Sequence, residues 1–80
     1  MTTQNAQTTI PAPAAQGSHF WVLTLELPGR AAMTQNGTYT PPVGMTRYDA
    51  HQAIRQYVIA DHPEMARATT VFFALESNQL

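Results

Sequence analysis

The feature that most constrains this chain is a nine-residue stretch at residues 19–27, HFWVLTLEL. Aromatic and aliphatic residues that are followed by Pro28-Gly29 predict a β-strand ending at Leu27. Alternate side chains of a strand point to opposite faces of a sheet. One face would carry Trp21 and three leucines, and the other would begin with Phe20 and Val22. A chain of 80 residues has little material with which to cover both faces.

The composition places the chain among small folded domains. Hydrophobic residues make up 44% of the sequence and charged residues 11%, which predicts a packed core rather than general disorder. The net charge of −1 argues against a strong attractive field for nucleic acid or membrane. The absence of cysteine excludes disulfides, thiolate metal sites and a cysteine nucleophile. With no long apolar run and no secretory signal pattern, we expect a soluble cytoplasmic protein.

Residues 1–18 differ in composition from the rest of the chain. They carry no charged side chain and are rich in Thr, Gln, Ala and Pro. Such a segment buries too little surface to offset its backbone entropy, so we expect a disordered tail at 1–18 and a folded domain at 19–80. Within the tail, Ile10-Pro11-Ala12-Pro13 is the part suited to docking in an extended conformation.

Three further elements follow the first strand. Residues 30–35 are expected to form a loop, with a turn at Asn36-Gly37 and a short edge strand at 37–40 that Pro41-Pro42 ends. Thr46, with Asp49 three residues later, predicts the start of a helix that ends before Pro63, with a short extra turn at 64–68. Its apolar face would hold Ala50, Ala53, Ile54, Tyr57 and Val58. The last predicted strand is 69–76.

The element order predicts an α+β fold of ββαβ type. We expect a three-stranded sheet of order 2-1-3, with the most apolar strand in the centre and one helix packed on one face. The helix-facing side would hold Trp21, Leu23, Leu25, Val71, Phe73 and Leu75. Phe20, Val22, Phe72 and Ala74 would then share the uncovered side.

This uncovered patch is the basis of the functional prediction. A contiguous apolar patch is seldom left bare on a monomer, because burying one Phe or Val contributes about 1.5–3 kcal/mol. A second copy, a different protein or the tail around Ile10 could cover it. The alternative is that these residues are ordinary strand formers without a role.

Sequence motifs for catalysis or metal binding are weak, so we expect no enzyme, no cofactor and no metal site. The histidines at 19, 51 and 62 lack the i, i+4 spacing of a helical metal pair, and Pro63 would separate the ligands of Asp61-His62-Pro63-Glu64. There is no Gly-x-Ser-x-Gly motif and no carboxylate pair suited to acid–base work.

Arg47, His51 and Arg55 follow one another at intervals of four residues. On a helix this spacing places them along one flank, where arginine could contact phosphates. The near-neutral total charge and the acidic residues Asp61 and Glu64 favour a solvated outer face instead. An accessory nucleic-acid-binding role is therefore the second hypothesis.

The segments FWVLTLELPG, GTYTPPVGMTRYDA and VFFALESNQL resemble a set of short actinobacterial proteins that have no assigned function. The resemblance covers most of residues 19–80 and implies a self-contained small domain, without implying any functional residue. Our first hypothesis is a non-enzymatic protein-interaction module. We expect it to form a homodimer, or to bind another protein, through Phe20, Val22, Phe72 and Ala74.

Overall fold

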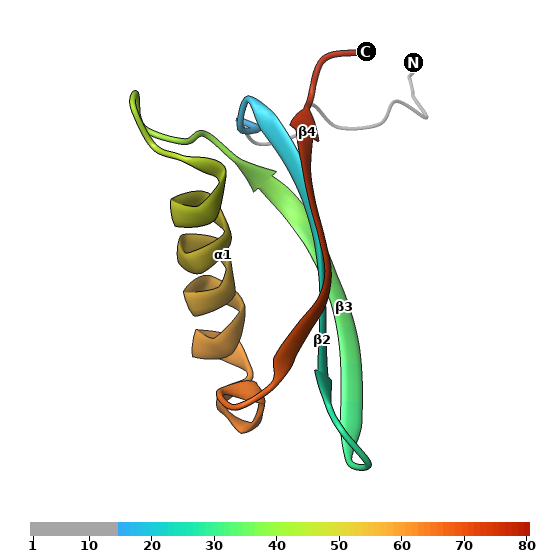
Figure 1. The fold of residues 1–80 in the computed structure, drawn as a ribbon. Coiled ribbons are helices and arrows are strands. Elements are labelled where there is room, and N and C mark those ends of the chain that lie inside the picture. The colour runs from blue at the N-terminus through green and yellow to red at the C-terminus, as the bar shows by residue number, and fades with distance from the viewer. Residues whose placement is uncertain (1–14) are drawn as a thin grey trace, which may run out of the picture.

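The computed structural model describes residues 15–80 (Figure 1). Three antiparallel strands form a sheet of order β3-β2-β4. A helix and a short 3₁₀ helix lie between the last two strands in the chain. The elements are β2 His19–Leu27, β3 Ala31–Tyr39, α1 Arg47–Asp61, η1 Pro63–Met65 and β4 Thr69–Ser77. The predicted α+β fold, with its order 2-1-3, is therefore confirmed. Most of the predicted tail, residues 1–14, lies outside the described residues.

Helix α1 begins and ends where the sequence predicts. The Thr46 side chain accepts a hydrogen bond from the backbone N–H of Asp49 at 3.1 Å, which satisfies one of the free donors of the first turn. At the other end, the N–H of His62 donates to the carbonyls of Val58 and Ile59. Pro63 then opens η1, the short extra turn that was expected.

The core lies between α1 and the middle of the sheet. Its buried hydrophobic residues come from β2, α1, the segment after the helix, and β4: Trp21, Leu23, Leu25, Ala50, Ile54, Val58, Met65, Ala68 and Leu75. Strand β3 contributes no fully buried residue, and only its Met33 and Tyr39 pack against this cluster. The helix therefore lies against one face of the sheet (Figure 1).

The predicted second strand was much too short. β3 spans nine residues, and it is joined to β2 by the three residues Pro28-Gly29-Arg30. Arg30 N–H donates to the Leu27 carbonyl, and Gly29 has φ +72°. Proline followed by a residue of positive φ is the pattern of a type II turn. The dipeptide that was expected only to end the strand is itself the hairpin turn.

The Asn36-Gly37 turn prediction was wrong for a related reason. Both residues lie within β3, where Asn36 pairs with Val22 and Gly37 pairs with Trp21. A Cβ at Gly37 would lie 2.9 Å from Cζ2 of Trp21, so the glycine leaves room for the indole. Glycine in a strand interior often marks such a close approach.

A β-bulge changes the side of the sheet to which Val71 belongs. β4 pairs regularly with β2 as far as Thr24↔Phe72, and the next pair is Leu25↔Thr70. Val71 is therefore an extra residue without a partner of its own, and it is 57% exposed. The prediction that Val71 faces the helix was wrong, because Thr70 takes the position next to Leu25.

Tyr57 was predicted to be a core residue, but 68% of its surface is exposed. Its ring meets Trp21 edge-on, at a centroid distance of 6.5 Å, at the margin of the core. Helical spacing correctly placed it on the flank near the sheet. Gly37, which pairs with Trp21 on β3, brings no side chain to cover it there.

The two ends of the folded region are tied together. The backbone N–H of Asn78 donates to the Ser18 carbonyl at 2.9 Å, and the Asn78 side-chain amide donates to Gln16 and Gly17. The N–H groups of Gly17 and Ser18 donate to the hydroxyls of Thr38 and Thr40. Residues 16–18, placed in the tail by the sequence, thus belong to the ordered hydrogen-bond network.

Candidate interaction surfaces

The open face of the sheet, the side opposite α1, carries the four residues singled out by the sequence. The register pairs Val22 with Ala74, and it places Phe20 and Phe72 on the same side, one on each flank of this pair: Phe20 lies opposite Glu76 and Phe72 lies opposite Thr24. Phe20 is 41% exposed and Phe72 is 54% exposed, while Val22 and Ala74 are half-buried. The prediction that these side chains share one face is confirmed.

The bulge enlarges this apolar patch. Val71 belongs to neither regular row of β4, and its exposed side chain adjoins Phe72 at the bulge. Strict alternation along the strand cannot reveal this residue, because the bulge inserts one position into the ladder. We define the open-face patch as Phe20, Val22, Val71, Phe72 and Ala74.

Polar residues frame the open-face patch along β3 and at its ends. Asn36 and Thr38 of β3 pair with Val22 and Phe20 of the patch, and Thr34 pairs with Thr24, the next position along the same side. The hydroxyls of Thr24 and Thr34 are 2.9 Å apart and form a cross-strand hydrogen bond. Glu26 and Glu76 lie at opposite ends of the same side. The face therefore carries an apolar patch over β2 and β4 that polar side chains border along β3 and at both ends; a polar border beside an apolar centre is common in protein–protein interfaces.

The basic flank of α1 is formed by Arg47, His51 and Arg55. These side chains form hydrogen bonds with other parts of the same domain. Arg47 donates to the Leu75 carbonyl at 3.3 Å, and Arg55 donates to the carbonyls of Ala66 and Ala68. The three side chains thus connect α1 to β4 and to the segment that precedes it. Donors used in this way are less available for phosphate oxygens, and so the structure offers no support for the nucleic-acid hypothesis.

His51 lies in the middle of this flank against the sheet. Its Nε2 is 2.9 Å from the hydroxyl of Thr70, and its ring meets Phe73 edge-on at 5.0 Å. Burial disfavours the charged imidazolium and is the main cause that lowers the pKa of His51 below 6.5; the nearby Arg55 charge acts in the same direction. His51 is therefore a packing residue that resists protonation.

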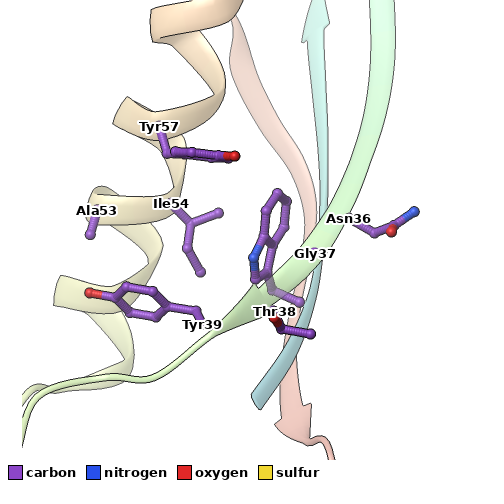
Figure 2. A pocket seen from close by; sticks show the side chains of 8 residues that line it. Asn36, Gly37, Thr38, Tyr39, Ala53, Ile54 and Tyr57 are labelled. Atoms are coloured by element: carbon purple, nitrogen blue, oxygen red, sulfur yellow. The ribbon is translucent and has the colours of Figure 1, made fainter. Parts of the chain in front are cut away.

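A hollow on the helix side lies between α1 and β3, and we call it the β3 groove. It encloses about 380 Å³. Its lining consists of Trp21, Asn36, Gly37, Thr38, Tyr39, Ala53, Ile54 and Tyr57. Figure 2 shows the Tyr57 ring extending from α1 toward the sheet and the Tyr39 ring extending from β3 toward the helix. Sequence reasoning missed this groove, because it treated Tyr39 and Tyr57 separately.

The segment after the helix offers weak metal-binding geometry. His62 Nδ1 lies 3.6 Å from a carboxylate oxygen of Glu64, and both side chains are substantially exposed. Among residues 15–80, no group of three or more acidic or histidine side chains is arranged to hold a metal ion.

Comparison of the chain with protein families, with curated proteins and with solved structures gives no significant match. Within the described part of the chain, no helix has the length and apolar character needed to cross a membrane.

Proposed function

We propose that this protein is a small non-enzymatic interaction module that pairs with a second copy of itself through the open-face patch. The observation that carries the proposal is the exposure of two phenylalanines and Val71 on the side of the sheet that no described element covers. Monomeric proteins seldom leave such residues together in water. The core on the other face is complete without them.

The layout of the open face suits a second copy. Apolar side chains occupy β2 and β4, and threonine and asparagine occupy β3. A two-fold axis perpendicular to the strands would stack β4 on β4 and β3 on β3, so that apolar meets apolar and polar meets polar. Dimers of this kind use the same patch on both partners. Two sheets stacked face to face would form a small sandwich with layers about 10 Å apart.

The size of the face sets the expected strength of pairing. Three strands about 4.8 Å apart and about 30 Å long present a face of roughly 400 Å². A stable complex typically buries about 800 Å² on each partner. The sheet face alone therefore supports a weak dimer that dissociates on dilution.

Sedimentation analysis of the full chain tests the proposal. We expect a monomer of 8.8 kDa at low concentration and a dimer at high concentration. Phe72→Glu places a charge within the patch, beside the Val22–Ala74 pair, and should give monomers throughout. Val43→Glu is the matched control, because Val43 is fully exposed in the loop before α1, outside the patch. Circular dichroism checks that both variants fold.

A monomeric wild type at the highest soluble concentration contradicts self-association, and so does a Phe72→Glu variant that dimerises like the wild type. A titration with short nucleic acids at low salt tests the second hypothesis in the same samples. Phosphate binding weakens steeply as salt rises, so salt-sensitive binding would favour the basic flank over the open face.

A further inference from the structure

We propose that the chain leading into β2 folds back over the open face of the sheet, and that residues 10–13, which we call the cover segment, pack on the open-face patch until a second copy displaces them. The cover segment lies outside the described residues, and the proposal rests on the described residues that lead to it. Competition with a second copy rests on the proposed function, whereas the docking of the cover segment does not.

The backbone of residues 17 and 18 is held on the side of the sheet that carries the patch. The N–H groups of Gly17 and Ser18 donate to the hydroxyls of Thr38 and Thr40 at 2.9 and 3.0 Å. Thr38 pairs with Phe20, so its side chain lies on the open-face side of β3. Thr40 comes two residues later, and alternation places its side chain on the same side. The chain therefore reaches the sheet on the open face, beside Phe20.

Asn78 holds the same stretch of chain from the other edge of the sheet. It lies two positions beyond Glu76, which pairs with Phe20 on the open face. Its side-chain amide donates to the side-chain oxygen of Gln16 at 3.0 Å and to the carbonyl of Gly17 at 3.1 Å. Residues 16 and 17 are thus held from both β3 and the end of β4, across one end of the open face.

The chain changes direction at Gly17. Ser18 bonds to Thr40, one position beyond the last pair of β2 with β3, and so continues the line of β2. Gly17 bonds instead to Thr38, two positions back along β3. A Cβ at Gly17 would lie 2.5 Å from the backbone nitrogen of Tyr39, so the two backbones are in contact and a side chain does not fit between them. Traced toward the N-terminus, the chain is therefore directed back over the open face.

The chain before Gly17 is long enough to span the patch. The cover segment lies four to seven positions before Gly17, which at about 3.3 Å per residue allows roughly 13 to 23 Å of reach. Phe72 pairs with Thr24, four positions along β2 from Phe20, or about 13 Å away. The cover segment can therefore reach every row of the patch from Phe20 to Phe72.

The cover segment and the patch have matching chemistry. Residues 10–13 read Ile-Pro-Ala-Pro, and residues 1–18 carry no charged side chain that docking would bury. Proline holds such a segment extended before it docks, so the segment loses little conformational entropy when its rings pack on aromatic rings. Phe20 and Phe72 supply exposed aromatic rings, one on each flank of the Val22–Ala74 pair.

A cover of this kind makes pairing depend on release of the cover segment. Two sheets stacked face to face lie about 10 Å apart with their side chains interdigitated, so they leave no room for a third chain between them. The patch can then hold the cover segment or the sheet of a second copy, but not both. The apparent affinity of pairing is reduced by the fraction of molecules whose patch is covered.

Paramagnetic broadening in the full chain, at a concentration where it is monomeric, tests the docking. The chain contains no cysteine, so Gln7→Cys carries a nitroxide label at a single defined position. We expect the methyl signals of Val71 and Ala74, on the open face, to lose most of their intensity. The methyl signals of Ile59 and Ala60, on α1, should keep theirs.

Substitutions in the cover segment separate docking from the effect of a nearby but undocked chain. The triple variant combines Ile10→Ser, Pro11→Ala and Pro13→Ala, and in it the open-face signals should recover most of their intensity. Thr2→Ala with Thr3→Ala is the matched control and should leave the broadening unchanged. All of these substitutions lie outside residues 15–80, so they leave the packed core intact.

Sedimentation of the unlabelled chains tests the competition. The triple variant should pair with a dissociation constant about five-fold lower than that of the wild type, because more of its molecules have an open patch. The control variant should pair like the wild type. Adding Phe72→Glu to the triple variant should abolish pairing, since the gain in affinity acts through the same face.

Three outcomes of the labelling experiment overturn the docking of the cover segment. Open-face signals that stay sharp, or that broaden equally in the triple variant, mean that the segment does not pack on the patch. Broadening confined to α1 places the segment on the other face. Broadening that appears only between labelled and isotope-enriched molecules in a mixed sample assigns the occupant to another copy.

The sedimentation results distinguish failure of this proposal from failure of self-association. A triple variant that pairs no more tightly than the wild type overturns the competition and leaves self-association standing. If neither chain pairs at any concentration, self-association is wrong and the competition falls with it. The docking of the cover segment is then decided by the labelling experiment alone.

Discussion

The indole of Trp21 lies across the backbone of Gly37 on the neighbouring strand, and it leaves too little space for even one methyl group at that position. An aromatic side chain that covers a cross-strand glycine compensates for the side chain that the glycine lacks. The pair fixes the depth of the β3 groove, because any larger residue at position 37 would fill its floor.

Substituting Gly37 should therefore destabilise the fold. Gly37→Ala reduces the entropy of the unfolded chain, a gain of about 0.4–1 kcal/mol, but overpacking costs about 1–3 kcal/mol. Because Trp21 is buried and cannot easily move away, we expect a net loss of about 1–2 kcal/mol in the free energy of unfolding. Urea denaturation measures it, and Asn36→Ala, at an exposed neighbouring position, should change little. Equal stability of wild type and Gly37→Ala would contradict the close packing.

Because of the β-bulge at Val71, we expect substitutions in β4 to have effects that simple alternation of side chains along the strand would not predict. Val71→Lys should fold with nearly wild-type stability, because Val71 is exposed. Leu75→Lys should not fold, because Leu75 is in the buried cluster and an unpaired charge there is very costly. Thermal melting followed by circular dichroism distinguishes the two. In the sedimentation assay, Val71→Lys should also weaken pairing.

Arg55 is expected to stabilise the junction between the helix and β4. Arg55→Met keeps most of the aliphatic stem but leaves the carbonyls of Ala66 and Ala68 without this donor. Since one of these carbonyls belongs to a buried residue, we expect a loss of about 1–2 kcal/mol. Arg30→Met, in the exposed β2–β3 turn, is the control and should be nearly neutral. If the two variants unfold at the same denaturant concentration, the hydrogen bonds of Arg55 do not contribute to the stability of the fold.

Stability should fall with decreasing pH because of His51. The folded protein holds the pKa of His51 below 6.5, mainly through burial, so the unfolded chain takes up the proton first. The contribution of neutral His51 to the free energy of unfolding is fully present above pH 6.5. It is lost as the pH falls from there through the lowered pKa of His51 in the folded state. His51→Gln should flatten the fall in melting temperature between pH 7.5 and pH 5. The pH-dependent loss should persist in His62→Gln, and its persistence in His51→Gln would contradict the assignment.

The sequence predicts those parts of the fold that depend on local and periodic signals. Thr46 and Pro63 mark the ends of α1, and the alternation in β2 identifies Trp21, Leu23 and Leu25 as core. These features follow from capping, from the geometry of proline and from the two-residue period of a strand.

The errors arise where a tertiary contact overrides a local signal. Asn36-Gly37 is a strong turn signal in isolation, but the glycine serves the packing of Trp21 instead. The bulge at Val71 depends on how β4 pairs with β2, which one strand's pattern does not contain. The β3 groove brings Tyr39 of β3 together with Tyr57 of α1, and the pattern of neither element alone contains this contact between elements.

The hydrogen bonds of Asn78 with Gln16, Gly17 and Ser18 bring the two ends of the described part of the chain to one place. A domain whose two ends lie together can be inserted into a surface loop of a host protein without distorting the host or the domain. Its ends can also be joined by a linker and new ends made elsewhere in the chain, as in a circular permutant. The Pro28-Gly29-Arg30 turn is exposed and lies at the far end of the sheet, so it is the natural position for that opening. A circular permutant that begins at Ala31 would keep every strand pairing, while the strands would follow one another in a different order along the chain.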